Sequence, residues 1–224
     1  MIDDSSSQIA SNRAALYHWF ALAFIAPPTE MEVVNMRDGK ARQLLIALAA
    51  TPGASRGIEA MNEVLASGTP AEVTSALCTA HSRLFYGVGG HQTASLYRSV
   101  YSSERGLLCQ QATAEMERVL RQLGLRLEDK VCEPSDHLSI QLEVMAQLAM
   151  RFVESAKKSS GALSTIQGEQ ADFLIAQLLS WVPTLSQRVV EVDDLGFHAG
   201  LISTLQAVLE QDLAFLTQAT AIPA

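Results

Sequence analysis

The chain has 224 residues, of which 48% are hydrophobic, enough to bury the core of one large domain or two small ones. Asp and Glu number 24 against 16 Lys and Arg, and the formal net charge of −8 argues against a nucleic-acid partner. The N-terminus lacks the positive charge of a secretion signal, and no apolar run reaches the roughly 18 residues that span a bilayer. We therefore expect a soluble, cytoplasmic protein.

The side chains that commonly bind metals are scattered. The three cysteines, Cys78, Cys109 and Cys132, are odd in number and lack the C-x-x-C spacing of a zinc site. The sequence therefore predicts reduced thiols, mostly buried as small hydrophobic side chains. The five histidines show no H-E-x-x-H or similar spacing, so we expect no metal site.

Helix signals follow one another through the first half of the chain. Pro27-Pro28 must stop the first helix. The S/T-x-x-E spacing of a capping box opens a helix at Thr29 and Glu32, and another at Thr69 and Glu72. The helices predicted in this half begin at about residues 7, 29, 40, 56 and 70.

Two segments follow without a clear helical pattern. Residues 87–93 contain three glycines in four positions, which favours turns, so we expect a surface loop. Residues 96–101 alternate too briefly to separate a strand from a short helix, and both structures stay open.

Helical periodicity returns in the second half. Leu107 and Leu108 begin an apolar stripe that predicts a helix from Gly106 to Gly124, and residues 125–133 are expected to be a linker. A buried stripe predicts a central helix over residues 138–154. Further predictions are a polar loop at 157–161, a helix at 168–181, a short helix opened by Pro183, and a long C-terminal helix capped by Asp193 and Asp194.

No run of sheet-forming length is present, so the sequence predicts an all-α fold. We expect a helical bundle in two halves, residues 1–124 and 136–224, joined by a hinge at residues 125–135.

The stretch from Val131 to His137 departs from the surrounding helical pattern. Glu133 precedes Pro134 and is pushed toward extended backbone, so we expect it to bind a ligand rather than cap a helix. Asp136 is predicted in the first turn of the central helix, where its carboxylate accepts from free backbone N–H groups. His137 lies at the positive end of that helix, which favours a neutral imidazole. For Asp136 and His137, structural and binding roles both stay open.

The sequence Glu133-Pro134-Ser135-Asp136-His137 resembles the E-P-x-D-H signature of the TorD/DmsD/NarJ family of redox-enzyme maturation chaperones. Residues 16–21 resemble the first helix of its TorD branch, and Arg83-Leu84-Phe85-Tyr86-Gly87 resembles the family's L-F-x-G stretch. The resemblance covers nearly the full chain.

The resemblance implies an all-helical cytoplasmic chaperone and not an enzyme. Its client would be the apo-form of a molybdenum-containing trimethylamine N-oxide reductase that is exported by the twin-arginine route. The chaperone would bind the client's signal peptide and assist insertion of the molybdenum cofactor before export. It implies no cofactor of the chain's own, apart from weak guanine nucleotide binding reported for some relatives.

A twin-arginine leader is basic and then apolar, so its receptor needs carboxylates beside an apolar groove. Glu133 and Asp136 are the expected carboxylates. The other residues expected to bind the peptide are Pro134, His137, Leu84, Phe85, Tyr97 and Tyr101. Resemblance to the TorD branch also implies that two chains exchange halves through the linker, which gives a mixture of monomer and domain-swapped dimer.

Two other function classes remain as alternatives. One is a helical nucleotide-binding protein or GTP hydrolase, although residues 87–93 lack the lysine of a phosphate-binding loop and follow a helix. The other is a helical oligomerisation scaffold without a dedicated client, since apolar stripes alone specify no partner.

Overall fold

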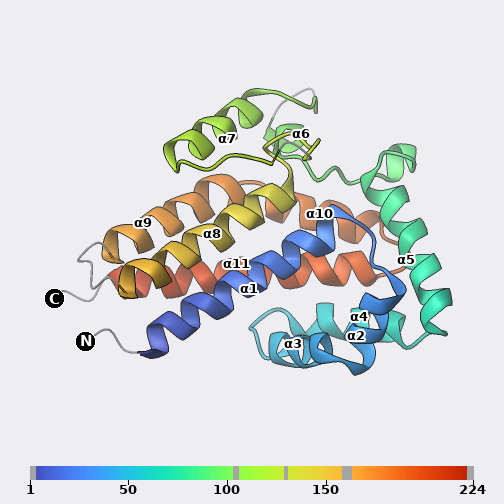
Figure 1. Cartoon of the computed structure of the whole chain (residues 1–224). Coiled ribbons are helices and arrows are strands. Elements are labelled where there is room, and N and C mark those ends of the chain that lie inside the picture. The colour runs from blue at the N-terminus through green and yellow to red at the C-terminus, as the bar shows by residue number, and fades with distance from the viewer. Residues whose placement is uncertain (1–3, 103–105, 129–130, 158–162, 221–224) are drawn as a thin grey trace. The chain divides into compact units, whose positions relative to one another are not determined.

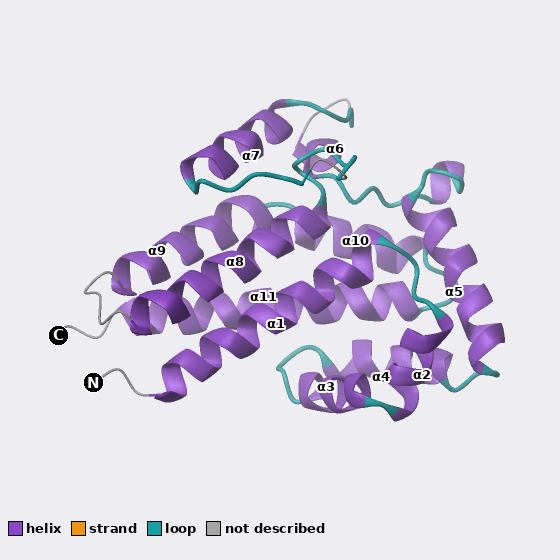
Figure 2. Cartoon of the chain, viewed as in Figure 1, coloured by secondary structure: helices purple, strands orange, loops and turns teal. Residues whose placement is uncertain are grey.

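The computed structural model describes residues 4–102, 106–128, 131–157 and 163–220. Over these ranges the chain consists of helices joined by turns and loops, with no strand among them, which confirms the all-α prediction (Figure 2). One isolated antiparallel bridge joins Tyr97 and His137. None of the described helices is both long enough and apolar enough to cross a membrane.

The helices form two compact units, each assembled from separated stretches of the chain. The first unit comprises Met1–Ile25, Leu96–Trp181 and Leu213–Ala224. The second comprises Ala26–Ser95 and Val182–Asp212. The predicted linker at 125–135 lies within the first unit, and residues 129 and 130 fall outside the described ranges. Its action as a hinge between residues 1–124 and 136–224 stays a prediction.

Two long helices organise the first unit. α1 (Asp4–Ile25) packs along α8 (Leu138–Lys157), as the blue and yellow ribbons of Figure 1 show. The predicted stripe of α8 is confirmed, since Leu142 and Met145 have no exposed surface and Phe152 keeps only 7%. Such burial stabilises a fold by roughly 1.5–3 kcal/mol for each large apolar side chain. The corner before α8 is therefore attached to a rigid core.

Shorter helices complete the first unit. They are α6 (Arg98–Ser102), α7 (Gln111–Gln122), α9 (Leu163–Phe173) and a π-helical turn at Leu174–Leu179. The prediction that a helix begins at Gly106 is wrong, because Gly106 and Cys109 adopt positive φ angles that a helix excludes. Leu107 and Leu108 are consequently exposed rather than part of a core stripe.

The sequence predicts that the helix after α8 begins near Gly168, and this start is also wrong. The helix, α9, begins at Leu163, and Gly168 lies inside it. Most of the polar loop predicted at 157–161 falls outside the described residues, since only Lys157, the last residue of α8, is described.

The second unit contains helices that begin where the sequence predicts. They are α2 (Glu30–Asp38), α3 (Lys40–Ala49), α4 (Ser55–Leu65), α5 (Pro70–Phe85) and α10 (Val182–Val192). Both capping boxes are present, with the side chains of Thr29 and Thr69 accepting from the backbone N–H groups of Glu32 and Glu72. Residues 87–93 are confirmed as a largely exposed loop that contains a short 3-10 turn, η1 (Gly90–Gln92).

The C-terminal helix α11 (Phe197–Thr220) starts with the predicted cap. Asp193 accepts from the backbone N–H of Ala199 at 2.9 Å and from that of Leu195 at 3.2 Å. Asp194, also predicted as a cap, instead forms an ion pair with Arg83 at 2.7 Å. Asp193 is therefore the aspartate that caps α11.

The exposure of the cysteines differs from the prediction. None of the three, all of which the structure describes, forms a disulfide. Cys109 and Cys132 are exposed and Cys78 is half-buried, so the prediction that they are mostly buried is wrong. Cys109 and Cys132 both lie in loops, which place them at the surface.

Two glycines let α4 and the start of α11 approach closely. A Cβ atom added at Gly200 would lie 2.3 Å from the carbonyl oxygen of Gly57. By contrast, a Cβ added at Gly168, within α9, meets no atom within 4 Å. Gly200 therefore fits a close helix contact, whereas Gly168 does not.

We expect Gly200→Ala to lower the free energy of unfolding by about 1–3 kcal/mol, because the helices must separate to admit the methyl group. The matched substitution Gly168→Ala should raise it by about 0.5–1 kcal/mol, because alanine favours a helix. Chemical denaturation of both variants checks the pair, and equal effects of the two substitutions would contradict it.

Candidate functional site

The corner at Glu133 to His137 is a turn that ends where α8 begins. The backbone N–H of His137 donates to the carbonyl oxygen of Pro134 at 3.0 Å, and α8 starts at Leu138. Asp136 therefore precedes the helix, and its predicted place in the first helical turn is wrong. Its carboxylate accepts hydrogen bonds from Ser99 and Thr113 rather than from the first turn of α8.

Asp136 ties three parts of the first unit together. Its side chain has no exposed surface and accepts from the backbone N–H of Ser99 at 2.8 Å and from the hydroxyl of Thr113 at 2.7 Å. Ser135 adds a bond from its own hydroxyl to the carbonyl oxygen of Thr113, at 3.1 Å. Because buried polar groups are costly when unpaired, these bonds fix α6 and α7 against the corner.

Backbone contacts reinforce this arrangement and settle the structure of residues 96–101. The N–H of Leu138 donates to the carbonyl oxygen of Leu96 at 2.8 Å, and the N–H of Arg98 donates to that of Asp136 at 3.2 Å. The segment thus runs as a brief bridge beside the corner and then turns into α6. Of the two structures that the sequence left open, the short helix is present from Arg98, and the strand is reduced to the single bridge at Tyr97.

His137 caps α8 with a ring nitrogen. It is 5% exposed, and its Nδ1 accepts from the backbone N–H of Ser139 at 3.2 Å, which assigns the proton to Nε2. Burial lowers the pKa of His137 to about 4, although the neighbouring carboxylates of Glu133 and Asp136 oppose that shift. The burial of the ring and its accepting Nδ1 favour the neutral imidazole that the sequence predicts.

Glu133 is the half-exposed carboxylate of the corner. It accepts a hydrogen bond from the hydroxyl of Tyr97, whose ring lies edge-on to His137 at 5.0 Å. Burial, followed by this hydrogen bond and the charge of Glu133, raises the pKa of Tyr97 above its usual value. The hydroxyl therefore stays protonated and keeps donating. Since a carboxylate has about four acceptor positions, Glu133 retains capacity for a ligand.

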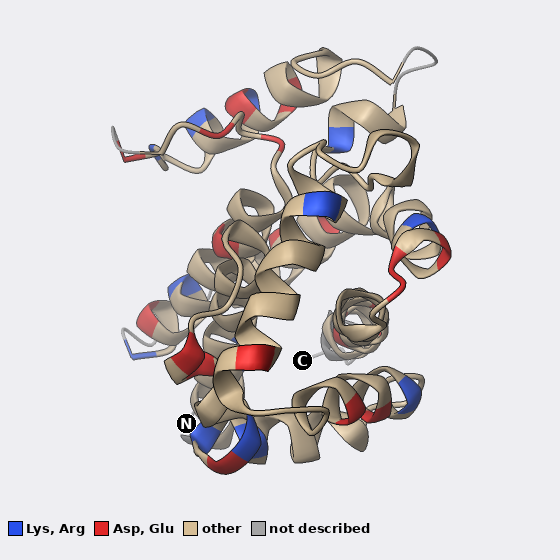
Figure 3. Cartoon of the chain, turned by 90° about the vertical axis from the view of Figure 1, so that its right-hand side faces the viewer, with Lys and Arg blue, Asp and Glu red and all other residues tan. Residues whose placement is uncertain are grey.

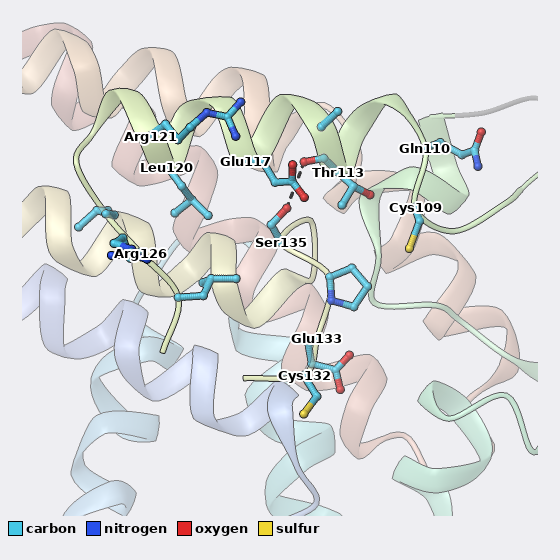
Figure 4. A pocket seen from close by; sticks show the side chains of 14 residues that line it. Cys109, Gln110, Thr113, Glu117, Leu120, Arg121, Arg126, Cys132, Glu133 and Ser135 are labelled. Carbon is cyan, nitrogen blue, oxygen red and sulfur yellow. Dashed lines mark hydrogen bonds between the residues drawn. The ribbon is translucent and has the colours of Figure 1, made fainter. Parts of the chain in front are cut away.

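A cleft of about 630 Å³ lies beside Glu133, between the corner and α7 (Figure 4). Its charged lining side chains are Glu117, Glu133, Arg121 and Arg126. Leu120, Leu125 and Leu127 are among its apolar lining residues, and Pro134 and Ser135 line it next to Glu133. The cleft combines carboxylates with apolar surface and also carries two guanidinium groups, but of the carboxylates and apolar residues predicted for the peptide groove only Glu133 and Pro134 line it.

The other predicted binding residues lie in different surroundings. Asp136 and His137 are buried, so contact between them and a peptide would require the corner to open. Tyr101 is half-buried and packs against the ring of Trp181 at 5.5 Å. Peptide binding by these residues stays a prediction.

Leu84 and Phe85 belong to the second unit, where both are buried. Phe85 packs edge-on against the ring of His81 at 5.0 Å and against that of His198 at 5.4 Å. Burial of both side chains and the ring contacts of Phe85 place them in the core of that unit, and peptide binding by them also stays a prediction.

Sequence reasoning missed the contribution of α7 to the cleft. Glu117 and Arg121 are one helical turn apart on its exposed surface, and Leu120 between them faces the protein with 6% exposure. The amphipathic pattern predicts the helix but not what its polar side faces. The bond between Thr113 and Asp136, which positions α7, joins residues far apart in the sequence.

The lowered pKa of His137 makes stability depend on pH. The unfolded chain binds a proton below about pH 6.5, whereas the folded chain does not until about pH 4. The neutral His137 therefore makes its full contribution to the free energy of unfolding above pH 6.5. This contribution is lost as pH falls toward 4, at up to roughly 1.4 kcal/mol per pH unit.

We expect the free energy of unfolding to fall less between pH 6.5 and pH 4.5 in His137→Gln than in the native chain, because one titrating group is gone. Urea denaturation of both proteins across this range measures the two slopes. Parallel curves would show that His137 does not titrate differently in the folded and unfolded chains.

Comparison with known proteins shows to which family the chain belongs. A sequence profile of the family described as "Nitrate reductase delta subunit" matches residues 50–187. The protein named "Chaperone protein TorD" from Vibrio vulnificus is 29% identical over 91% of this chain and 94% of its own length. Proteins of the same name from Vibrio parahaemolyticus and Aliivibrio fischeri are each 26% identical over the same shares of both chains. This chain therefore belongs to the nitrate reductase delta subunit family, the family of TorD and NarJ.

Proposed function

We propose that this protein is a cytoplasmic chaperone that binds the twin-arginine signal peptide of an apo trimethylamine N-oxide reductase and assists molybdenum cofactor insertion before export. Membership of the family and similarity to proteins named as chaperones along about nine-tenths of the chain support this function. The cofactor is cargo for the client and needs no site of its own in the chaperone.

The half-exposed carboxylate of Glu133 at the edge of the cleft is the observation that carries the proposal. An arginine side chain prefers a carboxylate that accepts two of its N–H groups, and such charge-assisted bonds are about twice as strong as neutral ones. Glu117 supplies a second carboxylate in the same cleft, enough for a pair of arginines. The leucines of the cleft provide a surface for the apolar part of a leader.

The buried members of the corner act by positioning Glu133. Tyr97 holds the carboxylate directly, and Asp136 holds the turn from which Glu133 projects. A carboxylate held in one place loses little conformational entropy when a ligand binds. The E-P-x-D-H signature then combines one binding residue with residues that fix its geometry.

The alternative functions receive no support from the comparisons, since the similar proteins are named as chaperones. In the glycine-containing loop, the carbonyl oxygens of His91 and Thr93 accept hydrogen bonds from Arg188. This guanidinium therefore ties the loop to α10 of the same unit.

Glu133→Gln keeps an acceptor for Tyr97 but removes the charge. We expect it to weaken binding of a synthetic twin-arginine leader at least about tenfold, since a hydrogen bond to a charged group contributes roughly 1.5–3 kcal/mol. Isothermal titration calorimetry measures the affinity, and circular dichroism should show unchanged helical content.

Glu154→Gln is the matched control, because Glu154 is exposed on α8 and does not line the cleft. Its leader affinity should equal that of the native protein. A leader in which both arginines are replaced by glutamine should bind weakly to all three proteins. Equal affinity of native and Glu133→Gln protein for the arginine leader would refute the site.

The oligomeric state is a further part of the proposal. Exchange of halves between two chains needs a connection that can extend, and residues 125–128 and 131–133 have no regular helix. We expect light scattering to show monomer and dimer in a ratio that follows protein concentration. A single monomeric species over a wide concentration range would rule the exchange out.

A further inference from the structure

The charges of the cleft are divided between its ends. In Figure 4, Arg121 and Arg126 lie toward the left, Glu117 lies near the centre, and Glu133 lies to the lower right. Figure 3 shows acidic and basic residues scattered among mostly uncharged helices. The cleft is therefore not a uniformly acidic receptor for a basic peptide.

These charged side chains are not neutralised by one another. Glu117 and Arg121 are four residues apart on α7, in the order that usually favours an ion pair. Nevertheless, neither they nor Arg126 form an ion pair or side-chain hydrogen bond within the described part of the chain, whereas Arg98 and Glu115 pair at 3.1 Å. The guanidinium groups at the basic end are thus available to a ligand.

Apolar surface connects the two ends. Leu120 is 6% exposed and forms part of the floor, while Leu125 is half-buried and Leu127 is 36% exposed. A ligand that fits this cleft has a cationic end, a short apolar middle and an anionic end.

We propose that Arg121 and Arg126 bind a carboxylate side chain of the leader peptide, located two to four residues from its arginine pair. This inference rests on the proposed function and names a second recognition element of the same site. The spacing follows from α7, where four residues from Glu117 to Arg121 rise about 6 Å. That length corresponds to about two residues of an extended peptide or about four of a helical one.

The division of charge also fixes the direction of the bound peptide. The leader's arginines are attracted to Glu117 and Glu133 and repelled by Arg121 and Arg126, so the reversed orientation places like charges together. Selection among leaders then depends on both an attractive and a repulsive contact. A leader without the acidic residue leaves two guanidinium groups without a partner.

The test uses leader peptides in which one glutamate is moved through the five positions on either side of the arginine pair, each compared with glutamine at the same position. One glutamate position should improve affinity for the native protein about threefold to fivefold, the range of partly exposed ion pairs. The gain should disappear in Arg121→Gln/Arg126→Gln and at high salt.

Arg118→Gln is the matched control, because Arg118 is exposed on α7 but does not line the cleft. It should keep the full gain from glutamate. If glutamate and glutamine peptides bind equally at every position while binding remains dependent on the arginine pair and on Glu133, the inference fails and the proposed function stands. If no peptide binds in an arginine-dependent way, both fail.

Discussion

The buried carboxylate of Asp136 is the constraint on which the site depends. It joins the start of α6, the first turns of α7 and the corner before α8, through bonds of 2.8 and 2.7 Å to Ser99 and Thr113. Because Asp136 has no exposed surface, these two donors take the place of water around its carboxylate. Loss of either bond would leave an unpaired buried group, so the three segments hold one geometry.

This constraint separates the residues that bind from those that position. Glu133 reaches the cleft because the turn behind it is fixed by Asp136, and because Tyr97 holds its carboxylate. His137 completes the corner as a neutral cap of α8. Conservative changes at the buried positions are therefore expected to alter geometry first and affinity only as a consequence.

Local signals predicted much of this molecule, and long-range contacts explain what they missed. The capping boxes at Thr29 and Thr69 need only residues three positions away, so the sequence reveals them. Asp136 looked like an ordinary helix cap because its true partners, Ser99 and Thr113, lie 37 and 23 residues away. The acidic group of Glu117 was missed for the same reason, since its place in the cleft depends on how α7 docks.

Hydrogen exchange and leader binding, measured together on Asp136→Ala, test most directly whether this buried carboxylate positions the site. The account predicts faster exchange at the Ser99 amide and at residues 133–139, and weaker leader binding although Glu133 is unchanged. The exchange of the second unit should stay as it is. Faster exchange at the corner with undiminished leader affinity would contradict the account.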